Sequence, residues 1–224
     1  IGGALDGQTV SAVAWGNIAG AVNAAQTAGV TARGNVTGNV IGGNDAVVLA
    51  SGNISGTITA TSGDAAVDAI GEITGGVWAF DAITVRAGKV NADVGSSDGA
   101  VDVSADGDVS SKINAKTSIA VHAGGNAAVW ETLTAAGGSA TISALGNITG
   151  ALVTVPQGDA SLFAGGNADV TVAQGAKNVN AVAFGNLGGS IHANESLVLS
   201  AWGSISGMTA VSYTHLRAHE TLRY

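Results

Sequence analysis

The chain of 224 residues contains no cysteine, one proline (Pro156) and only 4% aromatic residues. Without cysteine it can form no disulfide framework. It has no uninterrupted apolar run of 18 or more residues, so we predict no membrane-spanning segment. Basic residues are also scarce, with 8 Lys and Arg against 16 Asp and Glu and a formal net charge of −8. A nucleic-acid partner requires a clustered basic patch, and we therefore expect none.

Glycine, alanine and valine are abundant instead. The 35 glycines, about one residue in six, disfavour a helical protein, because a glycine inside a helix costs about 1 kcal/mol relative to alanine. Apolar and polar residues alternate in stretches such as "TVSAVA" at 9–14 and "ATISAL" at 140–145. A period of two residues is typical of β-strands. The composition and the alternation together predict an all-β protein.

A short phrase returns along the chain, as "LASGNISG" at 49–56, "SALGNITG" at 143–150 and "SAWGSISG" at 200–207. Each copy contains a glycine that follows an alternating run, which we call the anchor glycine. The anchors are Gly16, Gly34, Gly52, Gly71, Gly88, Gly107, Gly125, Gly146, Gly166, Gly185 and Gly203. They are separated by 17 to 21 residues. A near-constant period of about 19 residues predicts a solenoid.

The residues around each anchor indicate which side chains point inward. The second residue after the anchor is always apolar, and the second before it is alanine in ten of eleven copies. The exception is Arg86, in the copy where the spacing falls to 17; Ile83, Val85 and Ala87 keep the alternation there, so we expect one missing residue and an outward Arg86. The sequence predicts a right-handed parallel β-helix of about eleven coils over residues 1–210. The irregular period favours right-handed coils, since left-handed coils tend to show strict hexads.

Asparagine follows the anchor in seven copies, at Asn17, Asn35, Asn53, Asn126, Asn147, Asn167 and Asn186. We expect these side chains to hydrogen-bond to the neighbouring coil. In the middle of the chain Glu72, Lys89 and Asp108 occupy the same position on successive coils. Opposite charges stacked in that order are weakly favourable.

The Ala-x-Gly-Asn-Ile-Thr/Ser-Gly units resemble the haemagglutination-repeat region of filamentous-haemagglutinin-like bacterial exoproteins, over residues 11–210. The resemblance implies a right-handed parallel β-helix, use of an outer-membrane export machinery, and a secreted or cell-surface location. It also implies a shaft that adheres to a host or neighbouring cell-surface glycan or protein, or that spaces a distal domain from the cell.

The last fourteen residues, "VSYTHLRAHETLRY", differ in composition from the repeats. They resemble the translation of an adapter used in DNA library preparation. We therefore expect residues 211–224 to be a non-native tail; a short helix that caps the repeat is the alternative.

Parallel β-helices also include polysaccharide lyases and hydrolases, so a carbohydrate-active enzyme is the alternative function. That function requires polar groups at matching positions of successive coils, and Asp68, Arg86, Ser104 and His122 meet this requirement at intervals of 18 residues. Adjacent members are expected to lie about 5 Å apart on the outer surface. Without a second carboxylate at acid–base distance, an ion pair and an ordinary polar contact are the simpler interpretation, and we predict no catalytic residue.

The sequence contains candidate residues for two kinds of metal site. Acidic residues suited to Ca²⁺ cluster at Asp93, Asp98, Asp102, Asp106 and Asp108, although a solvated acidic face is the favoured interpretation. His122 and His192 lie on different coils, so we expect no transition-metal site, and no cofactor is predicted.

Trp15, Phe184 and Trp202 directly precede their anchors, whereas Trp78 and Trp130 lie elsewhere in their coils. Exposed aromatic side chains stack on sugars or contact a partner protein, or they cover the end coils. Because Phe184 and Trp202 are predicted on neighbouring coils, packing is favoured for them.

Overall fold

The computed structural model describes residues 1–129, 132–172 and 176–206. Eleven strands in this part of the chain form one long, straight side of a coil, and we call their outer surface the long face. They are β2 (Val10–Ala14), β4 (Ala28–Ala32), β6 (Ala46–Ala50), β8 (Ala65–Ile73), β10 (Ile83–Val90), β12 (Val101–Ala105), β15 (Ile119–Ala123), β18 (Ala140–Ala144), β20 (Ala160–Ala164), β22 (Asn178–Ala183) and β24 (Ser196–Ala201). No helix occurs among the described residues.

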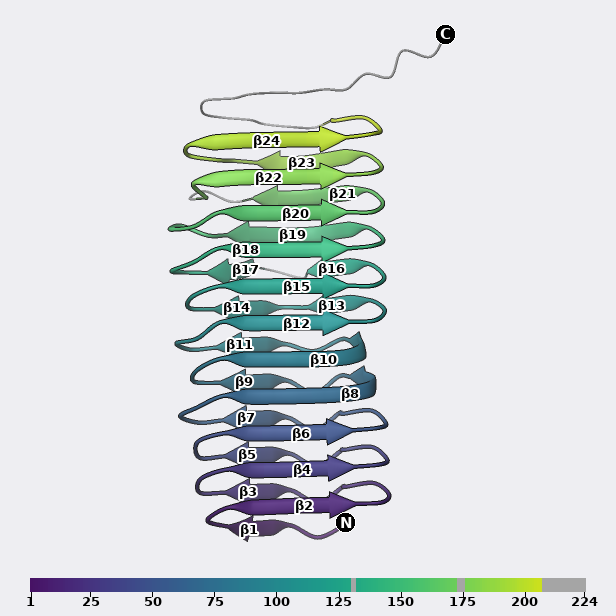
Figure 1. The fold of residues 1–224 in the computed structure, drawn as a ribbon, viewed down its shortest axis with the longest axis vertical. Helices are drawn as coiled ribbons and strands as arrows, with labels where there is room; N and C mark the ends of the chain where they lie inside the picture. The colour runs from purple at the N-terminus through teal and green to yellow at the C-terminus, as the bar shows by residue number, and fades with distance from the viewer. Residues whose placement is uncertain (130–131, 173–175, 207–224) are drawn as a thin grey trace.

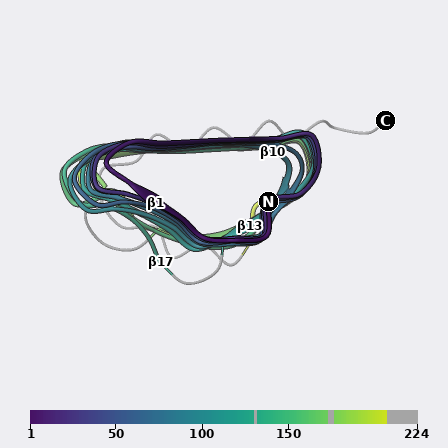
Figure 2. The same cartoon turned by 90° about the horizontal axis from the view of Figure 1, so that it is seen from below.

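The remaining strands form the opposite, bent side. They are β1 (Leu5–Gly7), β3 (Val22–Ala24), β5 (Val40–Gly42), β7 (Ile58–Ala60), β9 (Val77–Ala79), β11 (Val94–Ser96), β13 (Val109–Ser111), β14 (Ile113–Ala115), β16 (Ala127–Val129), β17 (Thr132–Ala135), β19 (Ile148–Thr154), β21 (Ala168–Val172) and β23 (Leu187–Ile191). Figure 2, seen along the rod, shows the flattened outline that the two sides enclose.

Each strand pairs in parallel with the equivalent strand of the next coil. The pairs Val10↔Ala28 and Ala28↔Ala46 show the commonest offset of 18 residues, and Ile119↔Ala140 shows the largest, 21. The eleven long-face strands thus enclose ten turns. In Figure 1 the long-face strands run left to right in front and the others run right to left behind, while the chain climbs from the N-terminus at the bottom. The coils are therefore right-handed, as the sequence predicts.

The interior is filled by the apolar positions that the repeat predicts. Ile18, Val36 and Ile54 stack at one position of successive coils and are fully buried. The partly exposed apolar residues that pack against this core are Leu5, Val10, Ala14 and Ile205, near the two ends of the stack, because an end coil has a neighbour on one side alone. Burial of a valine or isoleucine side chain contributes ~1.5–3 kcal/mol, which a single coil cannot obtain by itself.

The irregular copy at Arg86 also has the predicted structure. Val85 and Ala87 lie inside and Arg86 lies outside. The register between β10 and β8 shifts between Ala87 and Lys89, where one residue is missing relative to the coil below. The deletion is thus absorbed at the corner, and the long-face pairing is kept.

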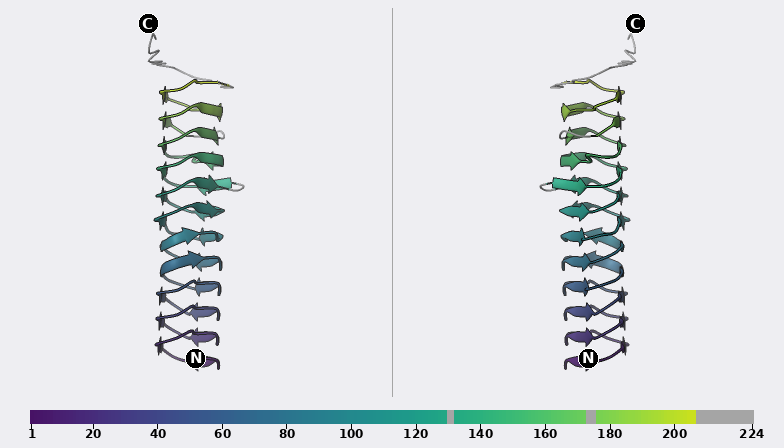
Figure 3. Two further views of the ribbon diagram at one scale, coloured as in Figure 1. Left: turned by 90° about the vertical axis from the view of Figure 1, so that its right-hand side faces the viewer. Right: turned by 90° about the vertical axis from the view of Figure 1, so that its left-hand side faces the viewer.

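Ten coil spacings of about 4.8 Å make a rod about 48 Å long. Figure 3 shows that the coils stack into a straight column without a change of direction. None of the described residues belongs to a helix long and apolar enough to cross a membrane. The predicted tail, 211–224, and Trp130 lie outside the described residues.

Candidate functional surfaces

The corner after the long face carries a ladder of asparagine side chains. The Oδ1 atom of Asn17 accepts the backbone N–H of Asn35 at 2.8 Å, and Asn35 accepts that of Asn53 in the same way. The ladder resumes higher in the rod, where Asn147 and then Asn167 accept the N–H of the next coil at 2.8 Å. The predicted hydrogen bonds between neighbouring coils are confirmed. Each one satisfies a backbone donor that the corner would otherwise leave exposed.

The same ladder explains why a glycine precedes each asparagine. A Cβ atom on Gly34 would overlap the Oδ1 atom of Asn17 in the coil below, and one on Gly52 would overlap that of Asn35. Gly16 lies in the first coil of the ladder and has no atom within 4 Å of this position. The glycine is thus required by the side chain stacked beneath it.

Charged side chains interrupt the ladder in the middle of the rod. The Lys89 Nζ atom lies 4.0 Å from Glu72 Oε1, with the two side chains 49% and 35% exposed, so this ion pair contributes only a few tenths of a kcal/mol. The backbone N–H of Asn126, which donates to Asp108 Oδ1 at 2.7 Å, is the main cause of the lowered pKa of Asp108. Desolvation is the next largest effect and opposes this shift, while the Asn126 side chain and the positive charge of Lys89 lower the pKa further.

The four polar residues proposed as an enzyme site do lie in one row. Arg86 pairs in register with Asp68 on one side and with Ser104 on the other, and Ser104 pairs with His122. Ion pairs between described residues join Lys89 to Glu72 and Lys116 to Asp98, and the expected pair between Asp68 and Arg86 is not formed. The reason is that strand register fixes the backbones, whereas two exposed charged side chains gain too little from pairing to be held together.

The surface around this row is open. A hollow of about 340 Å³ beside Asp68 is lined by Arg33, Leu49 and Ile70, and a second of about 170 Å³ lies between Asp68 and Arg86. Among the described residues that line either hollow, Asp68 is the one carboxylate. General acid–base catalysis by two carboxylates would require a second carboxylate beside Asp68. The described residues that line these two hollows provide none.

The acidic segment is dispersed over several faces. Asp102 lies in β12 on the long face, Asp98 pairs with Lys116, and Asp108 belongs to the corner ladder. Within the described ranges, no three His, Cys, Asp or Glu side chains come close enough together to hold a metal ion. His122 lies in β15 on the long face and His192 follows β23 on the other side, so these two residues are not brought together.

Aromatic side chains pack on one another at the C-terminal end of the long face. The ring centroids of Phe184 and Trp202 are 5.2 Å apart, which confirms the predicted contact. Phe163, which the repeat analysis did not single out, extends this cluster, with its ring 5.8 Å from that of Phe184. At the other end the guanidinium of Arg33 lies 3.9 Å from the ring centroid of Trp15, a cation–π contact.

Exposed apolar side chains thus gather near both ends of the long face. Trp15 and Ile70 are 79% and 75% exposed in the first coils, and Leu145 and Trp202 are 71% and 76% exposed in the last. The row from Asp68 to His122 begins in the coil of Ile70 and ends one coil before that of Leu145. Exposed apolar side chains that gather on one surface are typical of interaction sites.

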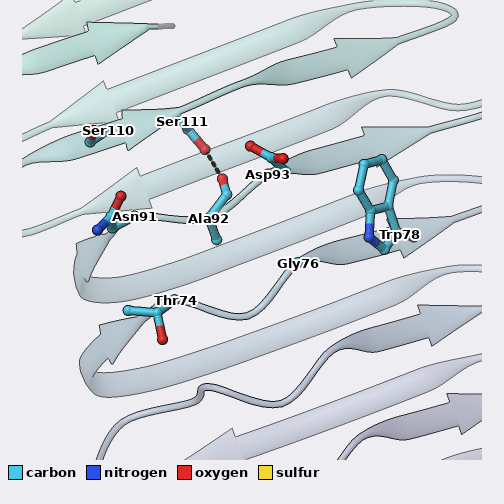
Figure 4. Close-up of a pocket in the computed structure, with 8 residues that line it drawn as sticks. All are labelled: Thr74, Gly76, Trp78, Asn91, Ala92, Asp93, Ser110 and Ser111. Atoms are coloured by element: carbon cyan, nitrogen blue, oxygen red, sulfur yellow. Dashed lines mark hydrogen bonds between the residues drawn. The ribbon is translucent and has the colours of Figure 1, made fainter.

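A different hollow, of about 420 Å³, lies on the bent side and is shown in Figure 4. Trp78 of β9 lies at one end, Thr74 and Asn91 lie at the other, and Asp93 lies between them. The Ser111 hydroxyl, also near the hollow, is buried and donates to the backbone oxygen of Ala92.

Glycines make room for Trp78. A Cβ atom on Gly95, which is paired with Trp78 in the next coil, would overlap the six-membered ring of the indole. A Cβ atom on Gly76 would lie 2.8 Å from the indole Nε1. The indole therefore lies against the backbone of the coil above, while the Trp78 residue stays 41% exposed. Trp78 and its neighbours were visible in the sequence, but their meeting across three coils was not predicted.

Comparison with protein-family models, with curated proteins and with solved structures gives no match to this chain. What the structure establishes is the class: an all-β, right-handed parallel β-solenoid of ten turns. The resemblance to filamentous-haemagglutinin-like repeats therefore rests on the repeated residues and on this fold.

Proposed function

We propose that the chain is a structural and adhesive shaft of a secreted or surface-anchored bacterial repeat protein, without catalytic activity in these repeats. The observation that carries the proposal is the continuity of the stack. Every coil bonds to the next through parallel strands on both sides, and most coils also do so through a side chain at the corner. Such an array holds its two ends at a fixed separation, which is what a spacer requires.

The exposed apolar groups near the two ends of the long face support the adhesive part of the proposal. Trp15 and Trp202 present large apolar surfaces to solvent at opposite ends of the same face. Large aromatic side chains dominate the energetics of protein interfaces. The resemblance to exported haemagglutinin-like repeats supports the cell-surface location and the use of an outer-membrane export machinery.

The rigidity of the shaft is tested with two spin labels. Because the chain lacks cysteine, Thr31→Cys and Ser143→Cys place one label each on β4 and β18, in one outward row and six coils apart. We expect a narrow distribution centred on about 29 Å plus the label linkers, from six spacings of about 4.8 Å. A broad distribution would refute a rigid shaft.

The enzymatic alternative is tested on the same protein. We expect no release of reducing sugars from a panel of neutral and acidic polysaccharides, and adhesion of protein-coated beads to cell monolayers. Sugar release that disappears in Asp68→Ala would establish an enzyme and overturn the proposal. Beads that fail to adhere would remove the adhesive part and leave the spacer.

A further inference from the structure

We propose that the hollow at Trp78 binds a neutral oligosaccharide, with the indole as the stacking platform. The proposal specifies a ligand class for the adhesive function and rests on it. It starts from the way Trp78 is held: one side of the indole is packed at Gly95, and the residue remains 41% exposed. A flat aromatic surface fixed against the backbone is the form in which proteins present a platform to a sugar ring, because little side-chain entropy is lost on binding.

Polar side chains with unused hydrogen-bonding capacity surround the platform. Thr74, Asn91 and Asp93 are exposed, and their side chains form no hydrogen bond or ion pair with another described residue. They offer a hydroxyl, an amide and a carboxylate, which together donate to and accept from sugar hydroxyls. An apolar surface beside a few converging polar groups is the usual composition of a small-molecule site, and about 420 Å³ is within the usual size range.

The architecture favours a linear chain of sugars as the ligand. Thr74 and Trp78 belong to one coil, Asn91 and Asp93 to the next, and Ser110 to the one after. The hollow therefore extends along the rod axis over two coil spacings, about 10 Å. An oligosaccharide that crosses the hollow obliquely to the rod axis places one ring on the indole and the next beside Asp93 and Asn91.

The charge of the residues that line the hollow favours a neutral sugar over an acidic one. Asp93 lines the hollow, the described residues that line it include no basic one, and the whole chain carries a formal net charge of −8. A sulfated or uronic-acid chain would bring its negative charge next to the Asp93 carboxylate, and Lys112, which lies in register with Asp93 in the next coil, is not among the residues that line the hollow. A neutral chain avoids this repulsion and uses Asp93 as a hydrogen-bond acceptor.

Isothermal titration calorimetry with cellohexaose and chitohexaose tests the proposal, with a heparin-derived hexasaccharide as the acidic comparison. We expect at least one neutral hexasaccharide to bind and the acidic one not to bind. Trp78→Ala is expected to weaken binding at least tenfold, and Trp78→Phe to recover part of it. Trp15→Ala is the matched control: its indole carries the guanidinium of Arg33 and lies on the other side of the rod, so this change leaves binding unaltered.

Each contrary result is informative. Binding of neither neutral hexasaccharide, or an affinity unchanged by Trp78→Ala in a protein with wild-type circular dichroism, would overturn the proposal, and so would tight binding of the heparin fragment. If Trp78→Ala alters the circular dichroism, the comparison of Trp78→Phe with the wild type decides. Beads that adhere while no hexasaccharide binds would refute this site alone, whereas hexasaccharide binding without bead adhesion would refute the adhesive function and leave the site.

Discussion

The corners after the long face are of two kinds. After β6 the chain turns at Ser51–Gly52 and the side chain of Asn53 bonds to the coil above. In β8 and β10 the strand instead continues around the corner, through Glu72 and Lys89. Asp108 occupies the same position as Glu72 and Lys89, yet its corner turns as the asparagine corners do, because its Oδ1 atom accepts the N–H of Asn126.

The comparison shows that the shape of the corner depends on whether its side chain accepts a hydrogen bond from the backbone of the next coil, and not on the charge of that side chain. A short side chain with an oxygen at the δ position reaches the backbone N–H of the next coil and stabilises a turn. Glutamate and lysine place their polar atoms farther from the backbone, and the residues there remain in extended conformation. The three predictions that follow test this interpretation, from the largest expected effect to the smallest.

The glycine before the asparagine should be the most sensitive position. Gly52→Ala places a methyl group on the Oδ1 atom of Asn35 and close to Gly34, so we expect a loss of about 2–3 kcal/mol in the free energy of unfolding. Gly107→Ala, whose nearest atom is Gly88 O at 3.0 Å, should cost less. Gly16→Ala is the control, since it meets nothing within 4 Å and should change stability by less than about 0.5 kcal/mol. Urea denaturation followed by circular dichroism measures all three, and equal losses would contradict the stacking explanation.

The acceptor itself should have an intermediate effect. Asn35→Ala removes the partner of the Asn53 N–H, and we expect a loss of about 1 kcal/mol. Asn35→Asp keeps an oxygen at the same place and should retain most of the stability. Lys89→Ala removes an exposed ion pair only and should cost less than about 0.5 kcal/mol. The idea fails if Asn35→Asp is as unstable as Asn35→Ala in thermal melts.

The smallest effect should be a dependence on pH at Asp108. Its pKa in the folded protein is lowered, mainly by the hydrogen bond from the Asn126 backbone. A lowered folded pKa means that the stabilisation is present above the ordinary aspartate pKa, near 4, and is lost as the pH falls through the folded value. We expect the drop in Tm between pH 6 and pH 3 to be smaller in Asp108→Asn than in the wild type. Identical drops would show that the Asp108 carboxylate does not stabilise its corner.

Much of the fold could be predicted because the same pattern of inward and outward residues recurs in every repeat. The inward positions, the asparagine hydrogen bonds and the compensation at Arg86 each follow from a local alternation or from the period. The sequence does not predict the two kinds of corner, because Glu72, Lys89 and Asp108 occupy the same position in the repeat and form one charged row. Only the reach of each side chain toward the next coil distinguishes Asp108 from the other two.

The surfaces were less predictable than the core. Register correctly placed Asp68 beside Arg86, but it does not fix side-chain rotamers, and the ion pair was not formed. The hollow at Trp78 depends on Gly76, on Gly95 and on the bend of the chain at Asn91 to Asp93, which lie on two coils. A period of 19 residues indicates which residues lie above one another, but it does not show where the surface between them is hollow.

The parallel register described above also has a genetic consequence. The lower and upper surfaces of a coil with an asparagine corner present the same alanine, valine and isoleucine positions and the same corner, so one such coil fits on another. An in-frame duplication or loss of about 18 codons within the gene would therefore lengthen or shorten the rod by one layer without creating a new interface. Unequal recombination between the repeats then changes the length of the rod by one coil at a time. Point mutations at the outward positions change instead which molecules the rod contacts.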